Sequence, residues 1–209
     1  MKKRTNNSGL TLPELLAASI ITVFVMIGVA SMDISLRNLF SGVSGNASAS
    51  VNAATIMRHM ANRIPEAIGD STIGGAGIGV ATGNGGGNDN RLWIRRDENA
   101  SHTPEIYTDD AWYSYQYSAS AHTLVYCTTP DAPGAPNPSS ACNSPVIQTF
   151  SNVTEFVPTI TNLQASEEFS VSIRLKTVSN ASLPYPSATN PEFTLTSAFS
   201  IPDTGNTIP

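Results

Sequence analysis

The sequence predicts an α+β protein in which a long N-terminal helix, with a membrane-embedded first half, packs against an antiparallel β-sheet. Three observations predict this class. Residues 15–32 are apolar or small and carry no charge, residues 47–68 return to helical periodicity, and several later segments alternate apolar and polar residues. The length of 209 residues suits one anchor and one compact domain.

The apolar run is long enough to be a membrane anchor. At about 1.5 Å per residue, residues 15–32 nearly cross a hydrocarbon core of roughly 30 Å, and we place the span at about residues 12–32. A cleaved secretory signal is the alternative. The run is longer than the usual apolar core of about 7–15 residues, and no A-x-A-like site follows it, so we expect the segment to stay on the mature protein. The basic residues before the span predict a cytoplasmic N-terminus and an external domain beyond Asp33.

Glu14 is the unusual residue of the anchor. An ionised carboxylate in a membrane helix costs at least about 2–3 kcal/mol and needs a partner. No Lys or Arg lies within a helical turn or two of it, so its natural partner is a free N-terminal amine, which cleavage near Gly9 would create. The alternative is purely structural, because Thr11 and Glu14 fit a capping box with Pro13 in the first turn.

These residues carry a family resemblance that covers about the first fifty positions. The basic tip is followed by Gly9, then Leu10, Thr11, Leu12, Pro13, Glu14, Leu15 and Leu16. This arrangement resembles the class III leader of type IV pilins and type II secretion pseudopilins. The family most often has Phe where this chain has Leu10, and Pro13 stands at the fourth mature position.

The resemblance implies a series of processing and assembly steps at the N-terminus. A prepilin peptidase would remove residues 1–9 by cutting after Gly9 and would methylate the new amine of Leu10. Glu14 would then pair with the Leu10 amine of a neighbouring subunit, which removes both unpaired charges from an apolar filament core. The implied partners are other pilin or pseudopilin subunits, the peptidase and the inner membrane. The implied location is a single-pass inner-membrane form with a periplasmic domain, then an extracellular or periplasmic filament.

Composition argues against several other function classes. The net charge is −5, and removing three of the 11 basic residues with the leader, against 16 acidic residues, leaves −8. No basic cluster survives, so we expect no direct nucleic-acid binding. His59, His102 and His122 do not stand at metal-ligand spacing, and we expect no metal or other cofactor.

Cys127 and Cys142 are the only cysteines. In an oxidising periplasm they are expected to form one disulfide around a Pro/Ser/Ala-rich loop, and two free thiols are the alternative.

The rest of the chain predicts the helix, a loop and the sheet. Gly28, Gly42 and Gly45 are expected to bend or weaken the helix. Residues 69–90 are predicted to be a flexible Gly/Asn-rich loop, and residues 91–209 the β domain. The helix face predicted to be apolar comprises Val51, Ala54, Met57 or Arg58, Ala61, and Ile64 or Ala67. The predicted strands are residues 91–96, 112–117, 123–127, 146–150, 153–160, 169–175 and 193–201.

Within the domain, the strand order is similar to W-type minor pilins and J-type minor pseudopilins. That similarity rests on pattern, and the final strand ends in Ile201-Pro202-Asp203 where the family often has Arg-Asn. It implies a minor subunit that acts in filament assembly or priming near the tip. The alternatives are a tip-displayed adhesin that uses the Cys127–Cys142 loop and the Tyr-rich strand, and a membrane-anchored periplasmic enzyme. We expect no enzyme, because Asp97-Glu98 and Asp109-Asp110 are the only acid pairs of interest and lack a motif around them.

Overall fold

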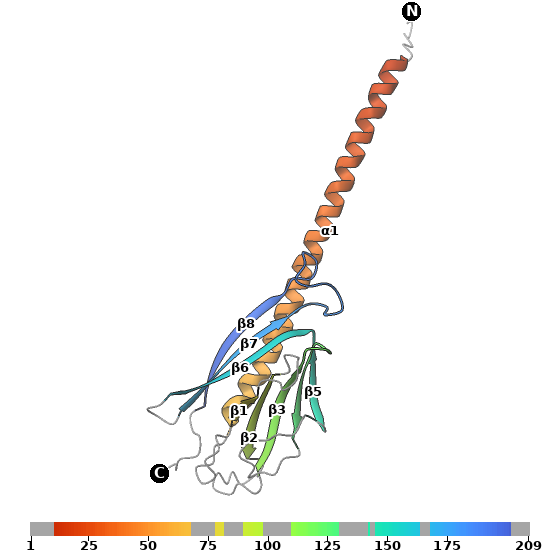
Figure 1. Cartoon of the computed structure of the whole chain (residues 1–209). Helices are drawn as coiled ribbons and strands as arrows, with labels where there is room; N and C mark the ends of the chain where they lie inside the picture. Colours follow the sequence, from red (N-terminus) through yellow and green to blue (C-terminus); the bar gives the residue numbers. More distant parts are fainter. Residues whose placement is uncertain are drawn as a thin grey trace, which may run out of the picture.

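A computed structural model of the chain describes residues 11–67, 78–81, 90–97, 110–129, 142, 145–163 and 168–201. The expected α+β architecture is confirmed: helix α1 (Leu12–Arg63) packs with its second half on antiparallel sheets, and its first half projects away from the domain (Figure 1). The leader, including Gly9 and Leu10, lies outside the described residues.

Helix α1 is continuous over 52 residues, so it does not melt locally at its glycines. Its start agrees with the sequence, since Thr11 is the N-cap and Pro13 lies in the first turn. Its end also has a local cause. Pro65 cannot donate the next backbone hydrogen bond, and the chain tightens into the 3-10 turn η1 (Ile64–Glu66).

The strands form two sheets, where the sequence analysis expected one. The five-stranded sheet has the order β1-β2-β3-β4-β5 and the three-stranded sheet the order β6-β7-β8, with every neighbouring pair antiparallel. The bounds are β1 (Ile78–Ala81), β2 (Arg91–Asp97), β3 (Asp110–Ser118), β4 (Thr123–Thr128), β5 (Val146–Ser151), β6 (Val153–Leu163), β7 (Glu168–Thr177) and β8 (Phe193–Ile201). All seven predicted strands are present, and β3 and β4 form the predicted hairpin.

Strand β1 was missed because it is a short, Gly-containing segment inside the predicted loop of residues 69–90. It becomes a strand by pairing with β2, in register Ile78 to Ile94. Tertiary pairing thus overrides a weak local preference.

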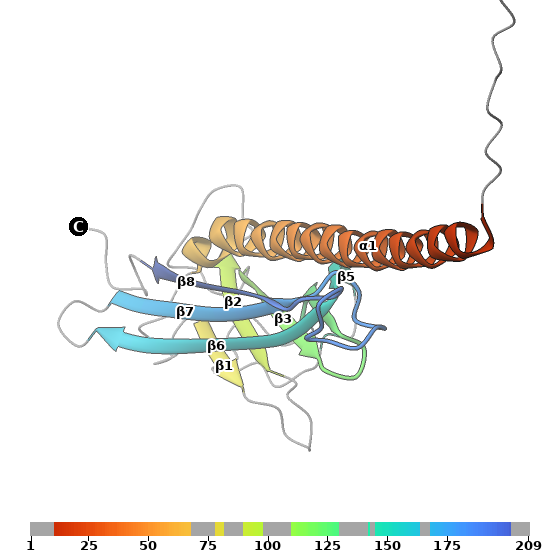
Figure 2. The ribbon, with the colours of Figure 1, turned by 90° about the horizontal axis from the view of Figure 1, so that it is seen from above.

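The two sheets are joined by a single residue, Asn152, which lies between β5 and β6 in the left-handed region with φ of 61°. Asparagine tolerates that conformation better than most residues. Figure 2 shows the result: β6, β7 and β8 run lengthwise beside the helix, whereas β1, β2 and β3 cross that direction.

The core fills the space between the helix and both sheets, and the predicted helix face is confirmed only in part, because Met57, Ile64 and Ala67 are buried. Val51 is 66 % exposed, and Ala54 and Ala61 are also exposed. The buried helix residues are Gly45, Ala49, Ala53, Ile56, Met57, Met60 and Ile64. Two stripes of similar spacing run along this helix. The stripe with the larger side chains near the C-terminal end of the helix is buried, because burial of apolar area holds the helix on the sheets.

Candidate functional site

Glu14 lies at the N-terminal end of α1 and closes the first turn. The backbone N–H and the hydroxyl of Thr11 both donate to Oε2 of Glu14, each at 2.8 Å. The capping geometry considered in the sequence analysis is therefore present. Among the described residues, nothing donates a hydrogen bond to the other carboxylate oxygen, Oε1, so the cap leaves half of the carboxylate open.

The helix surface that follows Glu14 is apolar and fully exposed. The most apolar window has a mean hydropathy of 2.4 with none of it buried, so α1 is long and apolar enough to cross a membrane. Its hydroxyls are turned back onto the helix: Ser19 donates to the carbonyl of Leu16 and Thr22 to that of Ala18, each at 2.8 Å. Such bonds satisfy the hydroxyls where no water is available.

Beyond the predicted span, a further apolar stripe stays uncovered. Phe40 is 69 % exposed, Val43 63 % and Val51 66 %. The full stripe is exposed and consists of Leu36, Leu39, Phe40, Val43, Ala47, Val51 and Ala54. Its spacing of three and four residues is that of a helix–helix contact.

The helix is fixed to the domain by the strap, which is residues 178–191 of the connection between β7 and β8. A Cβ atom added at Gly42 would overlap the carbonyl oxygen of Ala188, and one added at Gly45 would lie 3.1 Å from the carbonyl oxygen of Thr189. Both glycines, which the sequence analysis took as weak points, are therefore sites of close approach. Among the described residues, none lies within 4 Å of a Cβ atom added at Gly28.

Asn190 holds the strap in shape. Its side chain is completely buried, accepts a hydrogen bond from Ser179 Oγ at 2.7 Å and donates to the carbonyl of Asn180 at 2.7 Å. A neighbouring bond ties β7 to the helix, because the buried hydroxyl of Thr177 donates to the carbonyl of Ala49 at 2.8 Å. A buried network that is fully hydrogen-bonded fixes one arrangement of its parts.

The strap is also connected to the junction between the sheets. Asn152 donates from its side-chain amide to the carbonyl of Ser179 and accepts from the backbone N–H of Ala181, at 3.2 and 3.0 Å. Helix, strap and both sheets therefore form one connected body.

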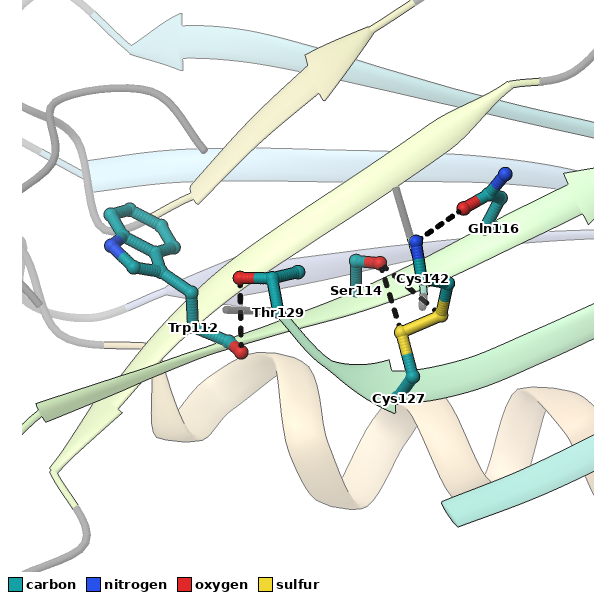
Figure 3. The surroundings of a disulfide bond; sticks show 6 residues. All are labelled: Trp112, Ser114, Gln116, Cys127, Thr129 and Cys142. Carbon is teal, nitrogen blue, oxygen red and sulfur yellow. Dashed lines mark hydrogen bonds between the residues drawn. A yellow bond between two sulfur atoms is a disulfide. The ribbon is translucent and has the colours of Figure 1, made fainter. Parts of the chain in front are cut away.

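The disulfide predicted from the sequence joins Cys127 of β4 to Cys142, with Cα atoms 5.8 Å apart. Figure 3 shows it beside β3, where Gln116 accepts a hydrogen bond from the backbone N–H of Cys142 at 2.9 Å and Ser114 lies next to both sulfurs. The side chains of Cys127 and Ser114 are fully buried. In this position the disulfide holds Cys142 beside β3.

The other side chains considered from the sequence have structural surroundings. His59 accepts or donates a 2.8 Å hydrogen bond with the Tyr115 hydroxyl and lies edge-on to Tyr126 and Phe150. Burial, and secondarily the Arg63 cation, lower the pKa of the His59 imidazole.

The Tyr-rich strand faces the core, since Tyr113, Tyr115 and Tyr117 are all buried. Asp110 forms a buried ion pair with Arg95 at 3.1 Å. His102, Asp109 and Glu98 lie outside the described residues. Within the described part of the chain, no three His, Cys, Asp or Glu residues come together as metal ligands would.

Three residues that shape this surface were missed in the sequence: Gly42, Gly45 and Asn190. The spacing of the two glycines, three residues apart on one helix face, is a signal for close approach of another backbone. Asn190 gave no signal, because its role depends on segments that only folding brings together.

Comparison with known proteins identifies no relative: no family model, no curated protein and no solved structure matches this chain.

Proposed function

We propose that this chain is a structural subunit of a type IV pilus or a type II secretion pseudopilus. The observation that carries the proposal is a helix that is fully exposed and apolar over its first half and has one carboxylate, Glu14, at its head. A surface of this kind requires a partner that is apolar along its length and positive at one point. A second helix that begins with a free amine supplies both.

The half-used carboxylate supports the pairing step. Both hydrogen bonds from Thr11 end on Oε2, so a positive N-terminus of a neighbouring subunit can approach Oε1 without breaking the cap. In this proposal the peptidase cuts after Gly9, the mature chain begins at Leu10, and the Leu10 amine of one subunit meets Glu14 of the next. The pair is strong only if both charges leave water together, which happens in the apolar centre of a filament.

The stripe from Leu36 to Ala54 supports assembly outside the membrane. Lipid covers the first part of α1 before assembly, but it does not reach Val51, which lies beside the folded domain. Helices of neighbouring subunits would cover the stripe once the chain has left the bilayer. The subunit is then held by apolar packing over most of its helix, with the charge pair setting the register.

The role of a minor subunit near the tip follows from the resemblance to W-type and J-type proteins. In this reading the chain takes part in priming a filament with other minor subunits, with its N-terminus cytoplasmic and its domain periplasmic before assembly. Subunit abundance in purified filaments tests it, since a minor subunit is present at far fewer copies than the major one.

The test of the pairing uses two substitutions that separate charge from capping. Glu14→Gln keeps an oxygen that accepts the hydrogen bonds of Thr11 but removes the charge, and glutamine is accepted in capping boxes. Thr11→Val removes the hydroxyl bond and keeps the charge. We expect Glu14→Gln to be processed to a chain that starts at Leu10 and then to fail to enter filaments, whereas Thr11→Val enters them.

Normal incorporation of Glu14→Gln would refute the pairing. Normal incorporation of Glu14→Gln together with failure of Thr11→Val would identify Glu14 as a helix cap only. Mass measurement of the mature chain is the control for processing, and a chain that still begins at Met1 in its native host would count against the whole family assignment.

A further inference from the structure

The exposed apolar part of α1 is longer than the hydrocarbon core of a bilayer. From Leu12 to Gly42, where the strap first meets the helix, the length is about 45 Å at about 1.5 Å per residue. The hydrocarbon core of a bilayer is about 30 Å thick, and the whole bilayer with its headgroups about 40–45 Å. The free helix therefore matches the full thickness of a bilayer, headgroup layers included.

The charges on the free helix fit that placement. In the stretch from Leu12 to Gly42 the only charged residues are Glu14, Asp33 and Arg37. With the helix spanning both headgroup layers, Glu14 lies in the inner one, where an ionised carboxylate is solvated. Arg37 lies at the outer boundary of the hydrocarbon, and Asp33, about 6 Å inside it, is neutralised by Arg37 at 2.9 Å. Phe40 then lies in the outer interface.

The end of the domain that meets the free helix is uncharged. Residues 178–191 of the strap contain no Asp, Glu, Lys or Arg. Leu183 is 51 % exposed, and Ala188 is exposed while its carbonyl oxygen lies against Gly42. Tyr185 of the strap adjoins His122 of the neighbouring turn between β3 and β4, edge-on at 5.8 Å between ring centroids. Figure 1 shows the strap, in dark blue, where the free half of the helix leaves the domain.

We propose that, before assembly, the strap rests on the outer headgroup layer of the bilayer. The inference rests on the membrane anchoring in the proposed function and adds a second contact with lipid, made by the domain itself. We assign lipid to this surface because the strap packs on the helix directly beyond its membrane-spanning part and lies at the depth where the bilayer ends. Since the strap packs closely on the helix at Gly42 and Gly45, and Asn190 holds the strap in shape, the contact also fixes how the domain stands on the membrane.

The test uses fluorescent labels on the full chain in vesicles of phosphatidylethanolamine and phosphatidylglycerol. The native cysteines are both in the disulfide, so an added cysteine is labelled alone under non-reducing conditions. Leu183→Cys and Ala188→Cys place an environment-sensitive label on the strap. Ser200→Cys, an exposed position near the far end of β8, is the matched control.

We expect quenching by headgroup spin-labelled lipid to be at least about twofold stronger for a strap label than for the Ser200 label, because only the strap lies in the headgroup layer. If the label at either strap position is quenched more strongly than the Ser200 label, the strap lies at the membrane surface. If neither strap label is quenched more strongly than the Ser200 label, the inference is overturned. Protection of the strap labels in purified filaments but not in vesicles would also overturn it, since the occupant is then another subunit. Flotation with the vesicles separates the two proposals: a chain that fails to float contradicts membrane anchoring itself, whereas a floating chain with unquenched labels contradicts only the strap contact.

Discussion

The close approach of the strap to the helix can be tested by adding a single methyl group. Gly42→Ala has two opposite effects. Alanine is favoured over glycine in a helix by about 1 kcal/mol, but its Cβ would overlap the carbonyl oxygen of Ala188, which is backbone and cannot rotate away. Overpacking of this kind typically costs about 1–3 kcal/mol, and relief would require the strap to move.

Because Asn190 and Thr177 hold the strap in place through buried hydrogen bonds, we expect the clash to outweigh the gain in helix propensity. Because the overlap is with backbone, we take the upper part of that range of overpacking costs, about 2–3 kcal/mol; after subtracting about 1 kcal/mol for helix propensity, Gly42→Ala should lower the free energy of unfolding by about 1–2 kcal/mol, measured on the full chain in detergent micelles by near-ultraviolet circular dichroism. Gly28→Ala is the matched control, since its Cβ meets none of the described residues within 4 Å. A Gly42→Ala protein as stable as the wild type would show that the strap does not pack tightly on the helix.

Three further predictions concern the disulfide, the His59 cluster and the apolar stripe. Replacing Cys127 and Cys142 with alanine together opens a loop with a sequence separation of 15 and should lower the stability by about 3 kcal/mol in chemical unfolding; a loss below about 1 kcal/mol would contradict this. The pKa of His59 is lower in the folded chain, so the unfolded chain binds more protons near its ordinary value of about 6.5. Stability should therefore fall as the pH drops through that value, less so in His59→Gln, and an identical pH profile for the two proteins would refute the assignment. Val51→Glu should leave the domain as stable as wild type yet impair incorporation into filaments, whereas Ser48→Glu, exposed elsewhere on the helix, should not; equal incorporation of both would exclude the stripe from assembly.

The sequence predicted the parts of the fold that depend on local pattern. The uncharged run of residues 15–32 predicted, by its length, a helix that could span a membrane, and the alternation of Phe169, Val171, Ile173 and Leu175 predicted β7, because a period of two is that of a strand. Cys127 and Cys142 were predicted to pair because only two cysteines exist.

The parts that depend on distant segments could not be predicted. The choice between two similar helix stripes was made by packing, so Val51 was expected inside and lies outside. The division into two sheets depends on Asn152, which looks like any loop asparagine until its φ is known. The strap depends on Asn190 reaching Ser179 and Asn180 across the connection, which local sequence does not encode.

Asn152 has a consequence for how the domain comes apart. This one residue connects the last strand of one sheet to the first strand of the other. Its side chain and its backbone also form hydrogen bonds with the strap that packs on the helix. We expect neither sheet to unfold while the other stays folded, because their separation would break the hydrogen bonds that Asn152 makes with the strap. The domain should consequently lose its structure in a single concerted step, with no long-lived half-opened form.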